Sequence, residues 1–271
     1  MDCETKYPVM LIHGAGFRDR KHLNYWGRIP DALEKHGATL FYGHQDSWGT
    51  IEHNAEVVKD TLSQILIDTN SSKVNIIAHS KGGLEARYMI STLNMAEKVA
   101  SLTTIATTHH GSRTVDLLCR LPKWLYRAAA SFTNLFFRIL GDKKPDFFTA
   151  SQQFSREYMK AFNHQNPDSP EVYYQSYAAA MKNPFSDLLM FWTNLLIGLI
   201  EGENDGLVTS QSAAWTNFRG TLRGATNRGI SHADVVDMRR RNFSKKSAND
   251  GTIDIREFYI GVVSHLKQLG L

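Results

Sequence analysis

Cysteine is almost absent from this 271-residue sequence, which contains only Cys3 and Cys119. Two cysteines make neither a disulfide framework nor the paired spacing of a zinc site. No apolar run reaches the roughly 18–20 residues that a membrane-spanning helix needs. The first six residues are polar and lead directly into an apolar run, so we expect no signal peptide. We therefore expect a cytoplasmic protein, or an exported one from which a leader has been removed.

Internal repeats, low-complexity segments and a strong excess of one charge are missing as well. Lys and Arg number 31 and Asp and Glu number 27, which gives a net charge of +4. The basic residues are scattered, apart from clusters at 18–21 and 239–246 that we expect to be solvated loops. We expect no nucleic-acid partner. The mild positive charge favours anionic partners such as lipid head groups.

The composition that remains is that of an ordinary globular protein, with 42% hydrophobic and 21% charged residues. Short β-branched runs alternate with amphipathic helical patterns, which indicates βαβ units and a mainly parallel sheet flanked by helices. Helical periodicity is clearest over 51–66 and 255–269. The expected strands are 8–13, 39–42, 73–79, 100–106 and 171–178. We expect a single α/β domain over residues 1–271.

Two stretches interrupt the alternation of strands and helices. Residues 113–165 contain no clear strand, and an apolar stripe with helical spacing includes Trp124, Phe132 and Phe136. Residues 184–200 are densely apolar. Together the two stretches predict a helical lid insertion over the sheet, in which those three aromatic residues bind substrate. The alternative is that both stretches are plain helices of the hydrophobic core.

The clearest functional signal is the segment 74–83, Val-Asn-Ile-Ile-Ala-His-Ser-Lys-Gly-Gly. A buried strand runs into a small-x-Ser-x-Gly turn, and a helical pattern follows from 84 to 90. Such a turn holds the serine in a strained conformation and exposes its hydroxyl at the carboxyl end of the sheet. Ser80 is therefore the predicted nucleophile. A serine hydroxyl needs a base that an acid orients, and here the acid and the histidine follow the serine in the chain.

Five motifs give the chain a specific resemblance to a known family. In their order and approximate spacing they resemble the true bacterial lipases of the α/β-hydrolase superfamily. The chain is similar also to the larger metal-binding lipases of thermophilic bacilli, even in its tail at 254–259. The resemblance covers most of the chain except the insertion, and it implies an α/β-hydrolase fold with a lid. The motifs are segments 7–14, 78–83, 103–112, 203–208 and 232–234.

The resemblance supplies the remaining members of a catalytic triad. It implies that Asp205, in an Asn-Asp-Gly-Leu-Val motif, is the acid and that His232 is the base. Asp187 and Glu201 are the rival acids downstream of the serine. The predicted triad follows the chain order serine, acid, histidine that is usual for this fold.

An oxyanion hole needs two backbone N–H donors aimed at the tetrahedral intermediate. By family likeness these donors belong to Ala15, which follows a His-Gly pair, and to Lys81, which follows the nucleophile. Gly14 and Gly16 leave the first loop free to bring its amides close. The family often has glutamine where this chain has Lys81, and a backbone donor should survive that exchange.

The same resemblance implies a structural calcium close to the histidine loop. Asp234, two residues after the base, fits the expected ligand, Asp237 could assist, and Asp187 is the candidate for a distant second carboxylate. Surface carboxylates without a metal are the alternative. The zinc-binding insertion of the thermophilic relatives is missing after 46–49, so we expect no zinc. Residues 250–257 imitate half of an EF-hand loop, but the other half lacks its ligands.

These features predict a serine hydrolase that cleaves carboxylic esters of acylglycerols or other lipids through an acyl-enzyme, without a required cofactor. The expected partners are a lipid or ester substrate and, in a transient contact, a lipid interface. An acyltransferase or thioesterase on the same fold is the alternative, because both use the same triad. A non-catalytic binding protein is a remote alternative, because such proteins usually lose a triad member. The oligomeric state is not predicted.

Overall fold

A six-stranded parallel sheet forms the centre of the computed structural model, which describes residues 2–19, 24–224, 228–240 and 254–271. The strand order is β2–β1–β3–β4–β5–β6, and every neighbouring pair is parallel. Parallel strands need crossover connections, so their carboxyl ends meet at one edge of the sheet. The strands are β1 Val9–Ile12, β2 Leu40–Tyr42, β3 Val74–His79, β4 Val99–Ile105, β5 Tyr173–Ala179 and β6 Phe218–Leu222.

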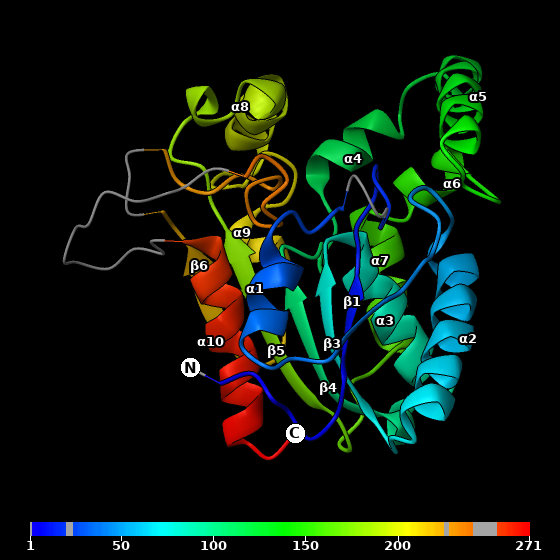
Figure 1. Cartoon of the computed structure of the whole chain (residues 1–271). Coiled ribbons are helices and arrows are strands. Elements are labelled where there is room, and N and C mark those ends of the chain that lie inside the picture. Colours follow the sequence, from blue (N-terminus) through cyan, green and yellow to red (C-terminus); the bar gives the residue numbers. More distant parts are fainter. Residues whose placement is uncertain (1, 20–23, 225–227, 241–253) are drawn as a thin grey trace.

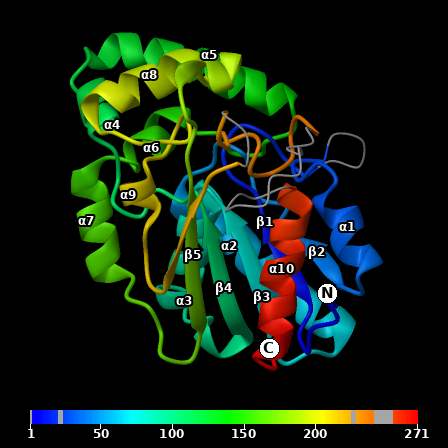
Figure 2. The same cartoon turned by 90° about the vertical axis from the view of Figure 1, so that its left-hand side faces the viewer.

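Helices cover both faces of this sheet (Figures 1 and 2). One face packs against α1 (Ile29–Lys35) and α10 (Ile255–Gln268), which bury Ile29 and Tyr259. The other face packs against α2 (Ile51–Thr69) and α3 (Lys81–Ser91), which bury Leu62 and Met89. The remaining helices are η1 Ala96–Lys98, α4 Arg113–Leu118, α5 Lys123–Ile139, α6 Phe147–Gln152, α7 Arg156–Gln165, η2 Pro184–Ser186, η3 Leu188–Met190, α8 Phe191–Ile200 and α9 Ser210–Ala213.

The predicted strands are confirmed to within two residues at each end, and the predicted parallel sheet is confirmed. Strand β6 is not among the predicted strands. Its sequence, Phe-Arg-Gly-Thr-Leu, has no buried residue and lies at the edge of the sheet. Its pairing with β5 is interrupted by a register shift. An edge strand of this kind has little hydrophobic signal, because its residues are exposed or only partly buried.

The predicted insertion divides into two parts with different packing. Helices α4, α5, α6 and α8 lie beyond the carboxyl end of the sheet, at the top of Figure 1. Helix α5 buries only Ala130, and its Trp124 and Phe132 are 73% and 76% exposed. These exposures rule out α5 as a core helix. None of the helices in the described part of the chain is long and apolar enough to cross a membrane.

Helix α7, at the end of the predicted 113–165 insertion, is a core helix instead. Its Met159 and Phe162 are buried in a cluster with Ile51 and Leu84, from α2 and α3. The covering part of the insertion therefore ends before α7. The second apolar stretch, 184–200, forms η2, η3 and α8, and its Trp192 is 75% exposed.

Candidate active site

Ser80 occupies a strained turn between β3 and α3. Its φ of 54° and ψ of −128° lie in a region that residues with a side chain rarely adopt. The turn is possible because Gly82 and Gly83, two and three residues after the serine, have no side chain. A Cβ on Gly82 would lie 2.5 Å from the backbone oxygen of His13, and one on Gly83 would lie 2.3 Å from Thr107 Oγ1. The helix thus packs directly on the sheet, and Ser80 stays partly exposed at its carboxyl end.

The structure brings Asp205 and His232 together. His232 Nδ1 lies 2.7 Å from Asp205 Oδ2, and the His232 backbone N–H donates to the Asp205 carbonyl at 2.8 Å. Asp205 Oδ1 accepts the backbone N–H groups of Leu207 and Val208 at 3.0 and 2.8 Å, so the turn fixes the carboxylate. A bond at Nδ1 leaves Nε2 of the imidazole available to a serine hydroxyl.

His232 also lies beside the nucleophile turn. Its ring centroid is 4.4 Å from that of His79, the residue immediately before Ser80. His79 is itself held by Tyr25, whose hydroxyl lies 2.7 Å from His79 Nδ1. The three predicted triad residues therefore come from three different loops at the same end of the sheet.

The loop that carries Ala15 lies against the nucleophile. A Cβ on Gly14 would stand 2.7 Å from Ser80 Cβ and 2.7 Å from the Tyr25 hydroxyl, so only glycine permits this approach. Ala15 directly follows Gly14 in this loop, and Lys81 begins α3 immediately after Ser80. A helix N-terminus presents N–H groups that lack partners within the helix, which suits stabilisation of an anion.

Neither rival acid faces His232. Glu201 Oε1 accepts Ser112 Oγ at 2.7 Å and both the N–H and the hydroxyl of Thr114, so it joins the end of α8 to the start of α4. Burial raises its pKa, but these hydrogen bonds outweigh burial and hold the pKa of Glu201 below its usual value. Asp187 is bound by the Ser231 hydroxyl at 2.8 Å and by the Arg239 guanidinium.

The carboxylates near the histidine loop do not fit a calcium ion. A site at Asp234 needs a second carboxylate, and Asp187 is already paired with Arg239. Asp237 accepts three hydrogen bonds from Arg28, at 2.7 to 2.8 Å. The carboxylates of Asp187 and Asp237 are therefore each paired with a guanidinium, although a calcium ion would need their oxygens as ligands. Across the described ranges, no three His, Cys, Asp or Glu side chains gather closely enough to hold a metal.

A buried ion pair that the sequence analysis missed stands directly behind the nucleophile. Lys81 and Glu85, one turn apart on α3, are 1% and 0% exposed and form a salt bridge. Lys81 Nζ also donates to the Gly49 carbonyl at 2.9 Å. Asn54 on α2 donates to Glu85 Oε1 at 2.7 Å. The i,i+4 spacing was a signal for the pair, but charged residues on a helix are usually exposed.

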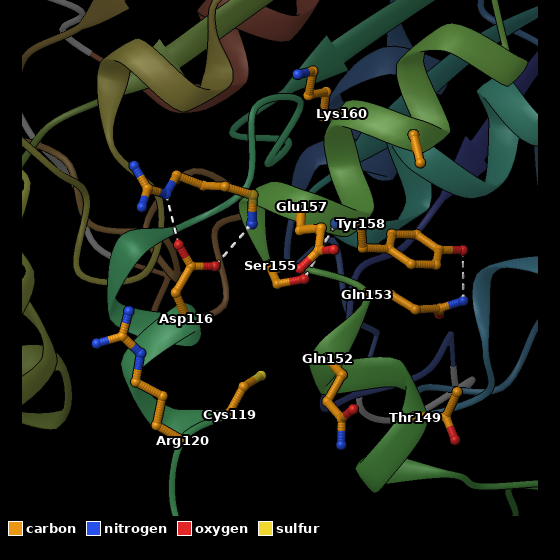
Figure 3. Close-up of a pocket in the computed structure, with 12 residues that line it drawn as sticks. Asp116, Cys119, Arg120, Thr149, Gln152, Gln153, Ser155, Glu157, Tyr158 and Lys160 are labelled. Carbon is orange, nitrogen blue, oxygen red and sulfur yellow. Dashed lines mark hydrogen bonds and ion pairs between the residues drawn. The ribbon is translucent and has the colours of Figure 1, made fainter.

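Two of the cavities near the insertion differ in the side chains that line them. The larger, of about 1000 Å³, opens between α4 and the α6–α7 region (Figure 3). Most of the side chains in its wall are polar or charged, and Arg156 binds Asp116 across it at 2.6 Å. It contains none of Ser80, Asp205 or His232. This cavity is therefore poorly suited to an acyl chain that must reach the serine.

The smaller cavity, of about 370 Å³, lies between the Ala15 loop and the carboxyl end of α5. Its lining includes Gly16 and Phe17 from that loop, and Phe137 and Leu140 from the end of α5. Predominantly apolar walls beside the oxyanion loop suit a hydrocarbon chain. The predicted substrate residues Trp124, Phe132 and Phe136 do not line it, and they stand on the outer face of α5.

Two fully buried histidines make the stability of the fold depend on pH. Burial lowers the pKa of His79 and His109 far below the ordinary value, and the neighbouring His232 and Arg87 lower them further. In the unfolded chain both groups bind protons near pH 6.5. A pKa that is lower in the folded than in the unfolded state costs stability as pH falls below the unfolded value.

We expect the free energy of unfolding to fall by about 3 kcal/mol between pH 7.5 and pH 5.5, or about 1.4 kcal/mol for each histidine. Urea unfolding at the two pH values measures this difference. His109→Asn should roughly halve it, because the contribution of His79 remains and that of His109 is removed. An equal difference in the variant would show that His109 does not carry this effect.

A six-stranded parallel sheet with a strained serine at its carboxyl edge, and an Asp–His pair beside that serine, define a hydrolase of the α/β class. The chain belongs to this family: the model described as "alpha/beta hydrolase fold" matches residues 7–217. It is 29% identical to triacylglycerol lipase 2 of Saccharomyces cerevisiae, over 93% of this chain and 77% of that protein.

Other relatives match shorter segments or the fold alone. A triacylglycerol lipase of Pseudarthrobacter phenanthrenivorans is 34% identical, over 42% of this chain and 37% of its own length. The solved lipase of Staphylococcus hyicus superposes with a TM-score of 0.69 at 16% identity, covering 98% of this chain and 97% of that one. A lipase of Bacillus licheniformis gives 0.64 at 21% identity, with 87% and 88% covered.

Proposed function

We propose that this protein hydrolyses carboxylic esters of lipids, with Ser80 as nucleophile, His232 as general base and Asp205 as the acid that orients it. The observation that carries the proposal is the 2.7 Å contact between Asp205 Oδ2 and His232 Nδ1, beside a serine held in a nucleophile turn. The lipase names of the relatives support the same reaction.

The reaction follows from this geometry in two halves. His232 Nε2 takes the Ser80 proton as Oγ attacks the ester carbonyl carbon, and the N–H groups of Ala15 and Lys81 stabilise the oxyanion. The intermediate collapses to an acyl-serine, and His232 gives its proton to the departing alcohol. A water molecule then attacks the acyl group with His232 again as base, and the carboxylic acid leaves Ser80 free.

Labelling with a fluorophosphonate probe tests the proposal directly. The probe should attach to Ser80 in the wild-type chain and fail to attach after Ser80→Ala. Labelling without hydrolysis of any ester, but with acyl transfer to an added alcohol or thiol, would favour the acyltransferase or thioesterase alternative. A chain that the probe does not label would be a binding protein.

Lipid esters are the proposed substrates because of the apolar cavity and the apolar helices above it. Each buried CH₂ of an acyl chain contributes about 0.8 kcal/mol, so four further carbons contribute roughly 3 kcal/mol when fully buried. We therefore expect kcat/KM to rise from two-carbon esters to a maximum at medium or long chains. A profile that falls steadily from acetate would make this a short-chain esterase.

Variants on the two faces of α5 separate acyl binding from interface contact. Phe137→Ala, in the cavity wall, should lower kcat/KM for long monomeric esters by about ten-fold or more and leave acetate esters nearly unchanged. Trp124→Ser and Phe136→Ser, on the exposed face, should affect only esters presented at a lipid interface. If kcat/KM fell equally for every ester, all three residues would have a structural role instead.

A further inference from the structure

Two helical segments present unpartnered apolar side chains at one end of the molecule. Both views place α5 and α8 beyond the carboxyl end of the sheet, on either side of α4 in Figure 1 and at a common height in Figure 2. We call their exposed apolar residues the cap surface. These residues are Trp124, Phe132, Leu135, Phe136 and Ile139 around α5, and Phe185, Leu188, Leu189, Trp192 and Leu199 around α8.

The apolar face of α5 points away from the body of the protein. The opposite face packs on α6: the Tyr126 ring lies 5.3 Å from that of Phe148, and Asn134 Oδ1 accepts the Phe147 N–H at 2.8 Å. Ala130, the buried residue of the helix, is on this inner side. The cap surface therefore cannot be covered by α6 in this arrangement, and it needs an external partner.

Positive charge accompanies the apolar residues. Between residues 117 and 145 the chain carries six cations and one acid, Asp142. Asp142 is buried and bound by the Ser47 hydroxyl and the Trp48 N–H, so it does not offset the exposed cations. Lys123, Arg127 and Arg138 share one flank of α5, because spacings of four and eleven residues return to the same side of a helix. The six cations are Arg120, Lys123, Arg127, Arg138, Lys143 and Lys144, all exposed.

We propose that the cap surface docks this protein on a bilayer that contains anionic phospholipid. An apolar helical face flanked by cations is the pattern that lies in a membrane interface, with the apolar side chains among the acyl chains and the cations at the head groups. A neutral lipid droplet would satisfy the apolar residues but not the charge. A second copy of the chain would oppose one cationic flank with another.

Docking brings the proposed catalytic serine close to the lipids of the membrane. The cap surface and Ser80 lie at the same end of the sheet, so a docked molecule turns its site toward the membrane. The inference rests on the proposed function for what the docked enzyme hydrolyses, but docking itself needs no catalysis. The two ideas can therefore fail separately.

Vesicle flotation of the full-length Ser80→Ala variant tests docking without hydrolysis. We expect binding to phosphatidylcholine vesicles to strengthen at least ten-fold when phosphatidylglycerol is included, since each surface cation contributes roughly five-fold on an anionic bilayer. Added salt should weaken this gain, because it screens exposed charges. Equal binding to both vesicles, or preferential binding to a triolein emulsion, would overturn the proposal.

Charge reversal on the flank of α5 provides the specific variant. Arg127→Glu/Arg138→Glu should abolish the preference for phosphatidylglycerol. Lys35→Glu/Lys98→Glu changes the net charge equally, at exposed positions in α1 and η1 outside the cap surface, and should keep it. If both variants lost the preference for phosphatidylglycerol equally, the preference would depend on net charge alone and not on the cap surface. Dimerisation in sedimentation velocity that the α5 variant removes, without any lipid binding, would identify a second copy as the partner.

Discussion

Replacing Ser80 by Ala, Asp205 by Asn or His232 by Ala is expected to lower kcat on a soluble ester by roughly 10⁴–10⁶-fold. Ser80→Ala removes the nucleophile, and His232→Ala removes its base. Asp205→Asn keeps the oxygen that accepts the Leu207 and Val208 N–H groups, so the turn should persist. Its amide, however, donates to Nδ1 and leaves the imidazole in the wrong tautomer.

Melting temperatures of the three variants should stay close to that of the wild type, which separates lost chemistry from lost folding. Glu201→Gln is the matched control for the acid. Its oxygen can still cap α4 through Ser112 and Thr114, so kcat should change by less than about ten-fold. If Asp205→Asn kept near-normal activity while Glu201→Gln lost it, the acid would have been assigned wrongly.

The sequence predicts the fold well where hydrophobic patterning is strong. Strands β1, β3 and β4 are buried along their whole length, so they appear in the sequence as short runs rich in apolar and β-branched residues. Strand β6 has no such run, because it pairs on one side only. The boundary of the insertion was placed too far along the chain for a similar reason. Helices α5 and α7 both show apolar periodicity, and periodicity does not say what lies against the apolar face.

Contacts between charged side chains that are far apart in the sequence are harder to predict than the motifs. Asp187 was considered as a triad acid and as a calcium ligand, because it is an acid at a suitable distance in sequence. Its pairing with Arg239 spans 52 residues and depends on how two loops meet. The Asp205–His232 contact also spans loops, but there the family motif supplied the expectation. Without such a motif, a single sequence gives little information on which charges meet.

The Lys81–Glu85 ion pair is the clearest example of a charge pair that the sequence did not predict. Breaking this pair has the largest effect on stability that we expect from a substitution. Both side chains are completely enclosed, so Lys81→Met leaves the Glu85 carboxylate buried without its cation. Removing one partner of a buried ion pair costs about 3–5 kcal/mol. For a chain of this size that corresponds to a fall in melting temperature on the order of 10 °C. Thermal or urea unfolding measures the loss.

The double variant Lys81→Met/Glu85→Gln is the control, because it also removes the Glu85 charge that the single variant leaves buried without a partner. Asn54 can still donate to the amide oxygen at position 85, so we expect the double variant to recover most of the lost stability. It does not recover the contact from Lys81 Nζ to the Gly49 carbonyl, which holds the first turn of α3. That turn supplies one of the two proposed oxyanion donors.

Deleting such a donor outright costs about 10²–10³ in kcat. A donor that is only less firmly placed should cost less, so we expect the refolded double variant to lose about ten-fold in kcat with KM nearly unchanged. A purely structural pair would give a double variant with restored stability and full kcat. That result would show that the Lys81 side chain stabilises the fold but does not position the Lys81 backbone N–H for catalysis.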